Sequence, residues 1–264
     1  MTDLLITCGS KLRHLYFAGR LAETFPNSAI IIEADEGESS KNYNAAPTEK
    51  MQKHFKEFDK IEKTFFENFV NDKKKLIEEK TIAKIKKGEI NSPETSELIK
   101  KSNPKFIAVY STSLIKPELF DAFPRRWINL HAGLSPYYRG SGTNIYPILN
   151  KEPEYIGMTI HHIAKGIDDG NIILQGRPKI EETDNVHTIG CKCAVLGTDL
   201  MIKVMRKLFK GEKCPDIRQN KKLGRLYLRK EFTDETIDEI NRLTENGLMT
   251  EYAKNPKKIS IAEW

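Results

Sequence analysis

Apolar residues in the first part of the chain form short runs that a glycine turn and polar stretches separate. Residues 4–8 form one apolar run, and the apolar side chains of 12–25 recur at helical spacing. Residues 29–33 form a second apolar run. Runs that are apolar on both faces are typical of buried strands in a parallel sheet. The pattern predicts a strand, a helix and a strand, which is the start of an α/β fold, followed by a polar loop at 34–46.

Residues 48–103 have a mostly helical pattern. The sparse apolar residues of 73–87 predict that a first helix continues through them, and a further helix is predicted to begin at Pro93 and to end before Pro104. The charged residues of both signs nearly balance, which favours a solvated helix face. The apolar stripe of the first helix either packs inside the chain or forms the seam of a homodimer. Its members are Met51, Phe55, Phe58, Ile61, Phe65 and Phe69.

The second half of the chain continues the alternation of strands and helices. Strands are predicted at 106–110, 127–131, 156–163 and 172–175, the last two as a hairpin, and helices at 117–122, 145–149 and 186–209. The pattern predicts a mostly parallel sheet flanked by helices, with a catalytic domain at 1–211. Residues 212–264 hold one strand candidate and one helix candidate, at 225–229 and 234–243. They are predicted to form a small C-terminal appendage.

Composition narrows the class of protein. The 264 residues carry 43 Lys and Arg against 37 Asp and Glu, a formal charge of +6, with the two signs interspersed. A nucleic-acid binder usually gathers its basic residues into one stripe, so nucleic acid is not an expected partner. No long apolar run predicts a membrane span, and the first residues lack the pattern of a signal peptide, so a cytoplasmic protein is expected. The four cysteines form no CxxC pair, which predicts thiols and no metal site.

The strand at 127–131 ends in a polar loop that contains glycine, and it carries Asn129 and His131. Side chains two residues apart on a strand point to the same side, so both would face one pocket. An amide donor beside a titratable imidazole suits a reaction in which negative charge builds on a carbonyl oxygen. Spacing alone leaves open that both are satisfied polar residues at the end of a strand.

Asp168 is a candidate partner for this pair. It belongs to the turn 165–170, where a plain hairpin turn would need only one aspartate, whereas Asp169 is also present. If the hairpin folds its tip against the pocket, Asp168 can accept a proton from the imidazole and hold the ring in place.

These residues resemble the tetrahydrofolate-dependent formyltransferases, and the resemblance spans about residues 104 to 210. The motifs that carry it are Asn129-Leu130-His131, Leu134-Ser135-Pro136, Arg139-Gly140, Gly157-Met158-Thr159-Ile160-His161 and Ile167-Asp168-Asp169-Gly170-Asn171-Ile172-Ile173. The resemblance implies a Rossmann-like formyltransferase fold and a catalytic trio of Asn129, His131 and Asp168. His161 and His162 match no role in the motif and are interpreted as strand residues.

The same resemblance implies N10-formyltetrahydrofolate as the co-substrate. Its folate would lie between the stretch 111–115 and the loop before Asp168, with the pteridine between Leu114 and Ile115. Ordinary core packing of these residues is the alternative. The implied cofactor-binding residues are Thr112, Ser113, Leu114, Ile115 and Asp168.

Members of the family differ mainly in the amine that receives the formyl group. Methionyl-tRNA enzymes append a larger C-terminal domain. The purine enzymes, which formylate glycinamide ribonucleotide, open with a different phosphate loop from the turn Gly9-Ser10-Lys11 found here. The segments 133–144 and 224–230 are more similar to enzymes that formylate amino dideoxy sugars on dTDP or GDP for surface polysaccharide such as the O-antigen of lipopolysaccharide. This acceptor class is preferred.

A nucleotide-linked sugar carries two phosphates, for which the chain offers two candidate sites. One is the turn Gly9-Ser10-Lys11 at a helix N-terminus, and the other is Tyr138-Arg139-Gly140 beside the catalytic strand. Each could equally be a solvated loop. The remaining alternatives for the chain are a purine formyltransferase, a formylfolate hydrolase, and a non-catalytic protein that binds folate or a nucleotide sugar.

Overall fold

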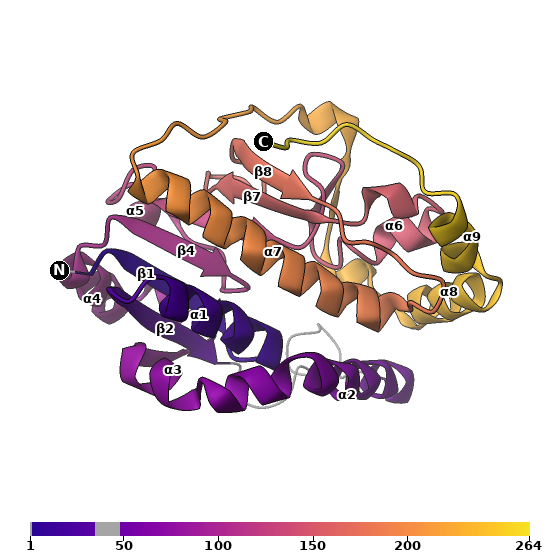
Figure 1. The fold of residues 1–264 in the computed structure, drawn as a ribbon, viewed down its shortest axis with the longest axis horizontal. Helices are drawn as coiled ribbons and strands as arrows, with labels where there is room; N and C mark the ends of the chain where they lie inside the picture. Colours follow the sequence, from indigo (N-terminus) through magenta and orange to yellow (C-terminus); the bar gives the residue numbers. More distant parts are fainter. Residues whose placement is uncertain (1, 35–47) are drawn as a thin grey trace.

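A computed structural model describes residues 2–34 and 48–264 of the chain, so the predicted loop at 34–46 lies outside the described residues beyond Ala34. Seven strands form one sheet in the order β3-β2-β1-β4-β5-β7-β8 (Figure 1). Neighbours from β3 to β5 pair parallel, whereas β7 pairs antiparallel with both β5 and β8. The strands are β1 (Leu4–Gly9), β2 (Ser28–Ala34), β3 (Thr81–Lys86), β4 (Phe106–Tyr110), β5 (Trp127–His131), β7 (Met158–His162) and β8 (Ile172–Gly176). The predicted fold class and the hairpin are confirmed.

Alternate side chains of the central strands enter two apolar layers. Leu4 and Ile6 pack with α1 and α7 on one face, and Leu5 and Ile107 pack with α4 and α5 on the other. Because both faces are covered, these strands read as unbroken apolar runs in the sequence. The helices are α1 (Leu12–Thr24), α2 (Glu49–Asp72), α3 (Lys74–Lys80), α4 (Pro93–Ser102), α5 (Pro117–Phe120), α6 (Tyr146–Leu149), α7 (Val186–Phe209), α8 (Asp234–Glu245) and α9 (Leu248–Lys254).

Glycine allows α7 to lie close to the strand that carries the candidate site. A Cβ atom at Gly197 would lie 2.7 Å from side-chain carbons of both Leu130 on β5 and Met158 on β7. Such a distance is too short for packed carbon atoms, so a larger residue would push the helix away from the sheet. Figure 1 shows α7 running across this face beside α1.

The sequence prediction of continuous helix at 73–87 is wrong for its second half. Helix α3 ends at Lys80, and residues 81–86 form β3 at the edge of the sheet, paired only with β2 among the described strands. Its side chains alternate between partly buried and exposed, since only one face of this edge strand is covered. Lys84 and Lys86, at two of the three exposed positions, hide the strand pattern in the sequence.

The apolar stripe of α2 packs inside the chain. Phe58, Ile61 and Phe69 pack against α1 and α7, and Met51 and Phe55 pack against α8. Of the stripe, only Phe65 is classed as exposed, at 38%. The observation that suggested a homodimer seam is therefore accounted for by contacts within one chain. The homodimer itself stays a prediction.

Residues after 211 return along the body of the molecule. Ile217 pairs with Ile172 at the start of β8, and β9 (Arg225–Tyr227) pairs parallel with β6 (Tyr138–Gly140). Helix α8 packs on α6 and α2, and the tail runs back beside β8, where the Gln175 N–H donates to the Ala262 carbonyl at 2.7 Å (Figure 1). Within the described part of the chain, no helix combines the length and the apolar surface that a membrane span requires.

Candidate active site

A cavity of about 570 Å³ opens at the carboxyl ends of β4 and β5. The carboxyl edge of an open α/β sheet is where such folds usually bind ligands. Two groups of residues line the cavity in addition to the predicted trio. The loop lobe comprises Ser111, Thr112, Ser113, Leu114, Ile115, Ile163, Ala164, Gly166 and Ile167, and the helix lobe comprises Arg13, His14, His54, Phe55, Phe58 and His187.

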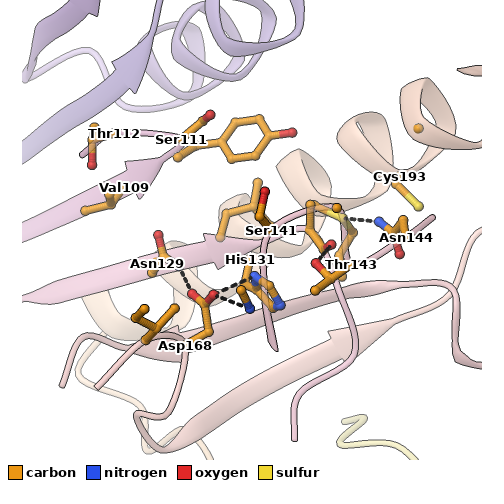
Figure 2. Close-up of a pocket in the computed structure, with 18 of the residues that line it drawn as sticks. Val109, Ser111, Thr112, Asn129, His131, Ser141, Thr143, Asn144, Asp168 and Cys193 are labelled. Carbon is orange, nitrogen blue, oxygen red and sulfur yellow. Dashed lines mark hydrogen bonds and ion pairs between the residues drawn. The ribbon is translucent and has the colours of Figure 1, made fainter. Parts of the chain in front are cut away.

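Asn129, His131 and Asp168 lie together in this cavity. Figure 2 shows the Asp168 carboxylate between the other two side chains. Its Oδ2 lies 3.3 Å from Nδ1 of His131, and its Oδ1 accepts from Nδ2 of Asn129 at 3.4 Å. Asn129 and His131 share one side of β5 because the strand alternates. Asp168 lies in the connection between β7 and β8, 37 residues after His131 in the sequence. The predicted meeting of the three residues is therefore seen in the structure.

The Asp168 carboxylate and the His131 imidazole form one titrating unit. The Nε2 of His131 donates to the Tyr138 carbonyl at 2.9 Å, so its Nδ1 faces Asp168. Burial alone would raise the pKa of Asp168, but His131, His161 and the Gly140 N–H more than offset it, so the pKa is held below its usual range. Burial also lowers the pKa of His131, which Asp168 opposes. The two groups therefore interact across a 3.3 Å gap, and each one shifts the pKa of the other.

His131 has no N–H directed into the cavity, because one nitrogen donates to Tyr138 and the other faces Asp168. Asn129 is only partly buried and lines the cavity. Of the two predicted oxyanion donors, Asn129 is the more exposed, but its amide would have to leave Asp168 or His161 in order to donate to a ligand oxygen. His131 lines the cavity with its Nδ1 directed at Asp168.

Sequence reasoning missed His161. Its Nδ1 donates to the His162 carbonyl at 2.8 Å, which leaves Nε2 to accept from Nδ2 of Asn129 at 3.0 Å. The same Nε2 lies 3.5 Å from Oδ1 of Asp168. His161 opposes Asn129 directly in the β5–β7 pairing. The cross-strand register was the information needed to find it, and a single sequence does not state that register.

The residues predicted for the folate divide between the cavity and the core. Thr112, Ser113, Leu114 and Ile115 all line the loop lobe. Leu114 is 60% exposed, while Ile115 is 5% exposed and packs mainly in the core with α5. Ile167, at 38%, is a second exposed large apolar side chain in the lobe. The predicted enclosure of a ring by Leu114 and Ile115 stays a prediction.

A buried carboxylate fixes the loop that follows β4. Glu33 lies near the end of β2 with its side chain fully buried, and it accepts from the N–H groups of Gly88 and Ser113. The Ser113 hydroxyl accepts from the same Gly88 N–H at 3.0 Å. These backbone donors around one carboxylate hold both loops in place. The 111–115 stretch is thus positioned before any ligand enters.

The turn Gly9-Ser10-Lys11 does not line the cavity in the described structure. Lys11 pairs with Asp59 at 3.2 Å, and the Arg13 N–H at the start of α1 donates to Glu62 at 2.7 Å. The second Glu62 oxygen accepts from the Arg13 guanidinium at 3.1 Å. A carboxylate from α2 therefore takes the place at the helix N-terminus that the sequence analysis gave to a phosphate.

The stretch Tyr138-Arg139-Gly140 forms β6 and not an open phosphate loop. Tyr138 is 3% exposed, its ring stacks on Tyr227 with centroids 5.5 Å apart, and its hydroxyl donates to Glu152 at 2.6 Å. Arg139 is buried and outside the cavity lining. Gly140 does line the cavity, and its N–H donates to Oδ2 of Asp168 at 3.0 Å. Of these three residues, Gly140 lines the cavity and contacts the trio, and the phosphate-binding role of the stretch stays a prediction.

The helix lobe is aromatic and nearly uncharged. The rings of His54 and His187 lie 4.5 Å apart, and Phe58 stacks on His187 at 5.4 Å. Burial lowers the pKa of each of these two histidines to about 4, so both are neutral at pH 7. Among the described residues that line the cavity, Arg13 alone is a lysine or arginine.

The histidine pair makes stability depend on pH. Below about pH 6.5 an unfolded chain protonates both rings, whereas the folded chain does not until about pH 4. The free energy of unfolding should therefore fall as the pH is lowered from 7 towards 4.5. His54→Phe should reduce that fall by on the order of 1–2 kcal/mol, measured by urea denaturation at pH 7 and pH 5. An unchanged pH dependence in this variant would assign the acid sensitivity to other groups.

The fold is an α/β sheet with flanking helices, and an amide lies beside a carboxylate–imidazole pair at the carboxyl edge of the sheet. The family model described as "Formyl transferase" matches residues 41–205, more than half of the chain. The chain belongs to the formyl transferase family.

The relatives found by sequence and those found by structure include formyltransferases named for different acceptors. Methionyl-tRNA formyltransferase of Caldanaerobacter subterraneus subsp. tengcongensis is 35% identical over 127 residues, which are 48% of this chain and 41% of that protein. The chain thus matches less than half the length of that curated relative.

Among solved structures, a sugar N-formyltransferase from Shewanella sp. FDAARGOS_354 has a TM-score of 0.60 at 18% identity, covering 91% of this chain and 87% of that one. An N-formyltransferase from Helicobacter canadensis, in complex with folinic acid and dTDP-3-aminofucose, has a TM-score of 0.59 at 20% identity, covering 96% and 82%. These likenesses show that the fold extends over nearly the whole chain.

Proposed function

We propose that this protein moves a formyl group from N10-formyltetrahydrofolate to the amine of a nucleotide-linked amino dideoxy sugar. The observation that carries the proposal is that Asn129, His131 and Asp168 contact one another in a cavity lined by the loop lobe and the helix lobe. The loop lobe would take the folate and the helix lobe the acceptor. Acyl transfer to an amine needs a donor that stabilises the oxyanion and a group that accepts the amine proton. An amide beside a carboxylate–imidazole pair can supply both.

The reaction forms one C–N bond and breaks another. The neutral acceptor amine attacks the formyl carbon, and the formyl oxygen gains negative charge that the Asn129 amide stabilises. The amine then loses a proton toward the Asp168–His131 pair, directly or through water. When the bond to N10 breaks, N10 of the folate takes up a proton. The lowered pKa of Asp168 keeps its carboxylate ionised and able to stabilise the proton on His131.

The loop lobe supports a flat, partly apolar ligand. Leu114 and Ile167 are exposed apolar side chains in its lining, and covering such a side chain contributes about 1.5–3 kcal/mol when burial is complete. Leu114→Ala should therefore raise KM for N10-formyltetrahydrofolate about 10-fold, with KM for the acceptor unchanged. Ile82→Ala, at an exposed apolar position on β3 away from the cavity, is the control. A KM within twofold of wild type for Leu114→Ala would remove this side chain from the folate site.

Two observations favour different acceptors. The matched sequence relatives are methionyl-tRNA formyltransferases, but that match covers about half of this chain. The sugar N-formyltransferase structures match 88–96% of it, including residues after 205. The helix lobe, with stacked aromatic rings and a single arginine, also suits a base and a sugar better than an extended RNA. A nucleotide-linked amino sugar is therefore the preferred acceptor. The formylated sugar would be used in the synthesis of surface polysaccharide.

The test is release of tetrahydrofolate from N10-formyltetrahydrofolate with a panel of acceptors. The panel contains dTDP- and GDP-linked 3-amino and 4-amino dideoxy sugars, methionyl-tRNA, glycinamide ribonucleotide, and no acceptor. Turnover with one nucleotide amino sugar supports the proposal. Turnover confined to methionyl-tRNA or to glycinamide ribonucleotide overturns the acceptor assignment, and release without any amine would indicate a hydrolase. Binding of formylfolate with no release in any arm would indicate a binding protein.

A further inference from the structure

One segment from the C-terminal part of the chain fastens the two loops that meet at Asp168. Residues 217–227, called here the C-terminal strap, begin at the Ile217 pairing with Ile172 and end in β9. The matched family region ends at residue 205, so the strap lies outside it. Its contacts with the site come in two places.

The first contact is made by Gln219. This side chain is 8% exposed, and its Nε2 donates to the Asp168 carbonyl at 2.8 Å and to the Gly170 carbonyl at 2.7 Å. Both N–H groups are thus used, one on each side of Asp169. The amide cannot be reversed, because its oxygen would then face two carbonyl oxygens. The orientation leaves Oε1 of Gln219 buried without a partner in the described structure.

The turn that Gln219 holds is backbone-strained. Asp168 has a φ of 47°, in the left-handed region that non-glycine residues rarely adopt. Such a conformation costs free energy and persists only where the surroundings fix it. The main-chain direction at Asp168 decides where its carboxylate points, and four protein groups lie within 3.5 Å of that carboxylate.

The second contact concerns Gly140, whose N–H donates to Oδ2 of Asp168 at 3.0 Å. Gly140 belongs to β6, which pairs with β9 of the strap, and the Ser141 N–H donates to the Tyr227 carbonyl at 2.9 Å. Gly140 has a φ of 96°, and a Cβ there would lie 2.1 Å from that carbonyl. The strap therefore holds a donor to Asp168 as well as the turn that carries it.

We propose that Gln219 is a positioning residue that directs the Asp168 carboxylate toward His131 by holding the main chain at 168–170. The inference rests on the proposed function in so far as Asp168 takes part in catalysis. Gln219 does not itself line the cavity and contacts Asp168 only at the main-chain carbonyl, so its effect on the reaction passes through Asp168.

The experiment compares Gln219→Met with Lys221→Met. Methionine keeps the volume of Gln219 and removes both donors. Lys221 contacts the same turn but only through the Asp169 side chain, at 2.8 Å. Gln219→Met should lower kcat about 10- to 100-fold with both KM values within threefold, while Lys221→Met should stay within threefold of wild type throughout. If Gln219→Met does not fold, Gln219→Asn, which is one methylene too short to reach both carbonyls, takes its place.

A second readout does not depend on turnover. The His131 pKa, measured by NMR on histidine labelled with ¹³C and ¹⁵N, should fall in Gln219→Met because Asp168 no longer supports the proton, and should not move in Lys221→Met. A lower melting temperature with unchanged kcat and an unchanged His131 pKa would overturn the proposal. If the wild type transfers formyl to no acceptor and the His131 pKa still falls in Gln219→Met, the positioning role stands and the proposed function fails.

Discussion

Asp168→Asn should reduce kcat about 10³-fold, equivalent to roughly 4 kcal/mol of transition-state stabilisation. Asparagine keeps the shape of the side chain and can still pair with Asn129. It carries no negative charge, so it cannot stabilise a proton on Nδ1 of His131, which lies 3.3 Å from Oδ2 of Asp168. The measurement is single-turnover formyl transfer at saturating co-substrate and acceptor, with the thermal midpoint recorded to show that the variant is folded.

The matched control is Asp169→Asn. Asp169 lies in the same turn, but its carboxylate pairs with Lys221 and makes no contact with His131. This variant should keep kcat within threefold of wild type. Equal losses in the two variants would mean that the turn as a whole, and not the carboxylate of Asp168, is needed for the reaction.

Asn129→Ala should lower kcat about 10²- to 10³-fold, the usual cost of losing one oxyanion donor. The substitution removes the amide that donates to His161 at 3.0 Å and to Asp168 at 3.4 Å. Because Asn129 is only partly buried and lines the cavity, folding should be retained and KM for the folate should change little. Steady-state kinetics with circular dichroism as the folding check would measure both, and a kcat within threefold of wild type would remove Asn129 from the mechanism.

His161→Asn tests whether His161 acts only through the Asn129 amide, which donates to its Nε2. If His161 serves only to orient Asn129, this variant should show a smaller loss than Asn129→Ala, and the double variant should lose no more than Asn129→Ala alone. Such non-additivity is expected of residues that act as one unit. Additive losses would assign His161 a separate role.

The buried parts of the molecule could be predicted well from the sequence, because buried positions require apolar side chains and these form a visible pattern along the chain. Strands covered on both faces, such as β4, are continuous apolar runs, and the two-residue spacing of Asn129 and His131 on β5 already places them on one side. An edge strand shows no such run. Residues 81–86 have lysines at two of their three exposed positions, so their alternation resembled the charged helix before them.

Contacts between distant segments were the features that the sequence could not predict. Strand β6 has three residues, and its partner β9 lies almost ninety residues later, so Tyr138 was interpreted as a loop residue. Glu62 reaches the N-terminus of α1 from a different helix, and His161 meets Asn129 only through the register of two antiparallel strands. Each contact depends on how distant segments pack in three dimensions, and a single sequence shows no local pattern that indicates such packing.

The C-terminal strap also bears on how the enzyme is made. Chains are synthesised from the N-terminus at about 5–20 residues per second, so the segment that carries Asn129 and Asp168 leaves the ribosome seconds before Gln219 and β9. During that interval the chain lacks the hydrogen bonds from Gln219 to the Asp168 and Gly170 carbonyls and the pairing of β9 with the edge of β6. A nascent chain halted after α7 would therefore contain every residue of the trio without these contacts, and the turn at Asp168 would gain them only after residues 217–227 have been made.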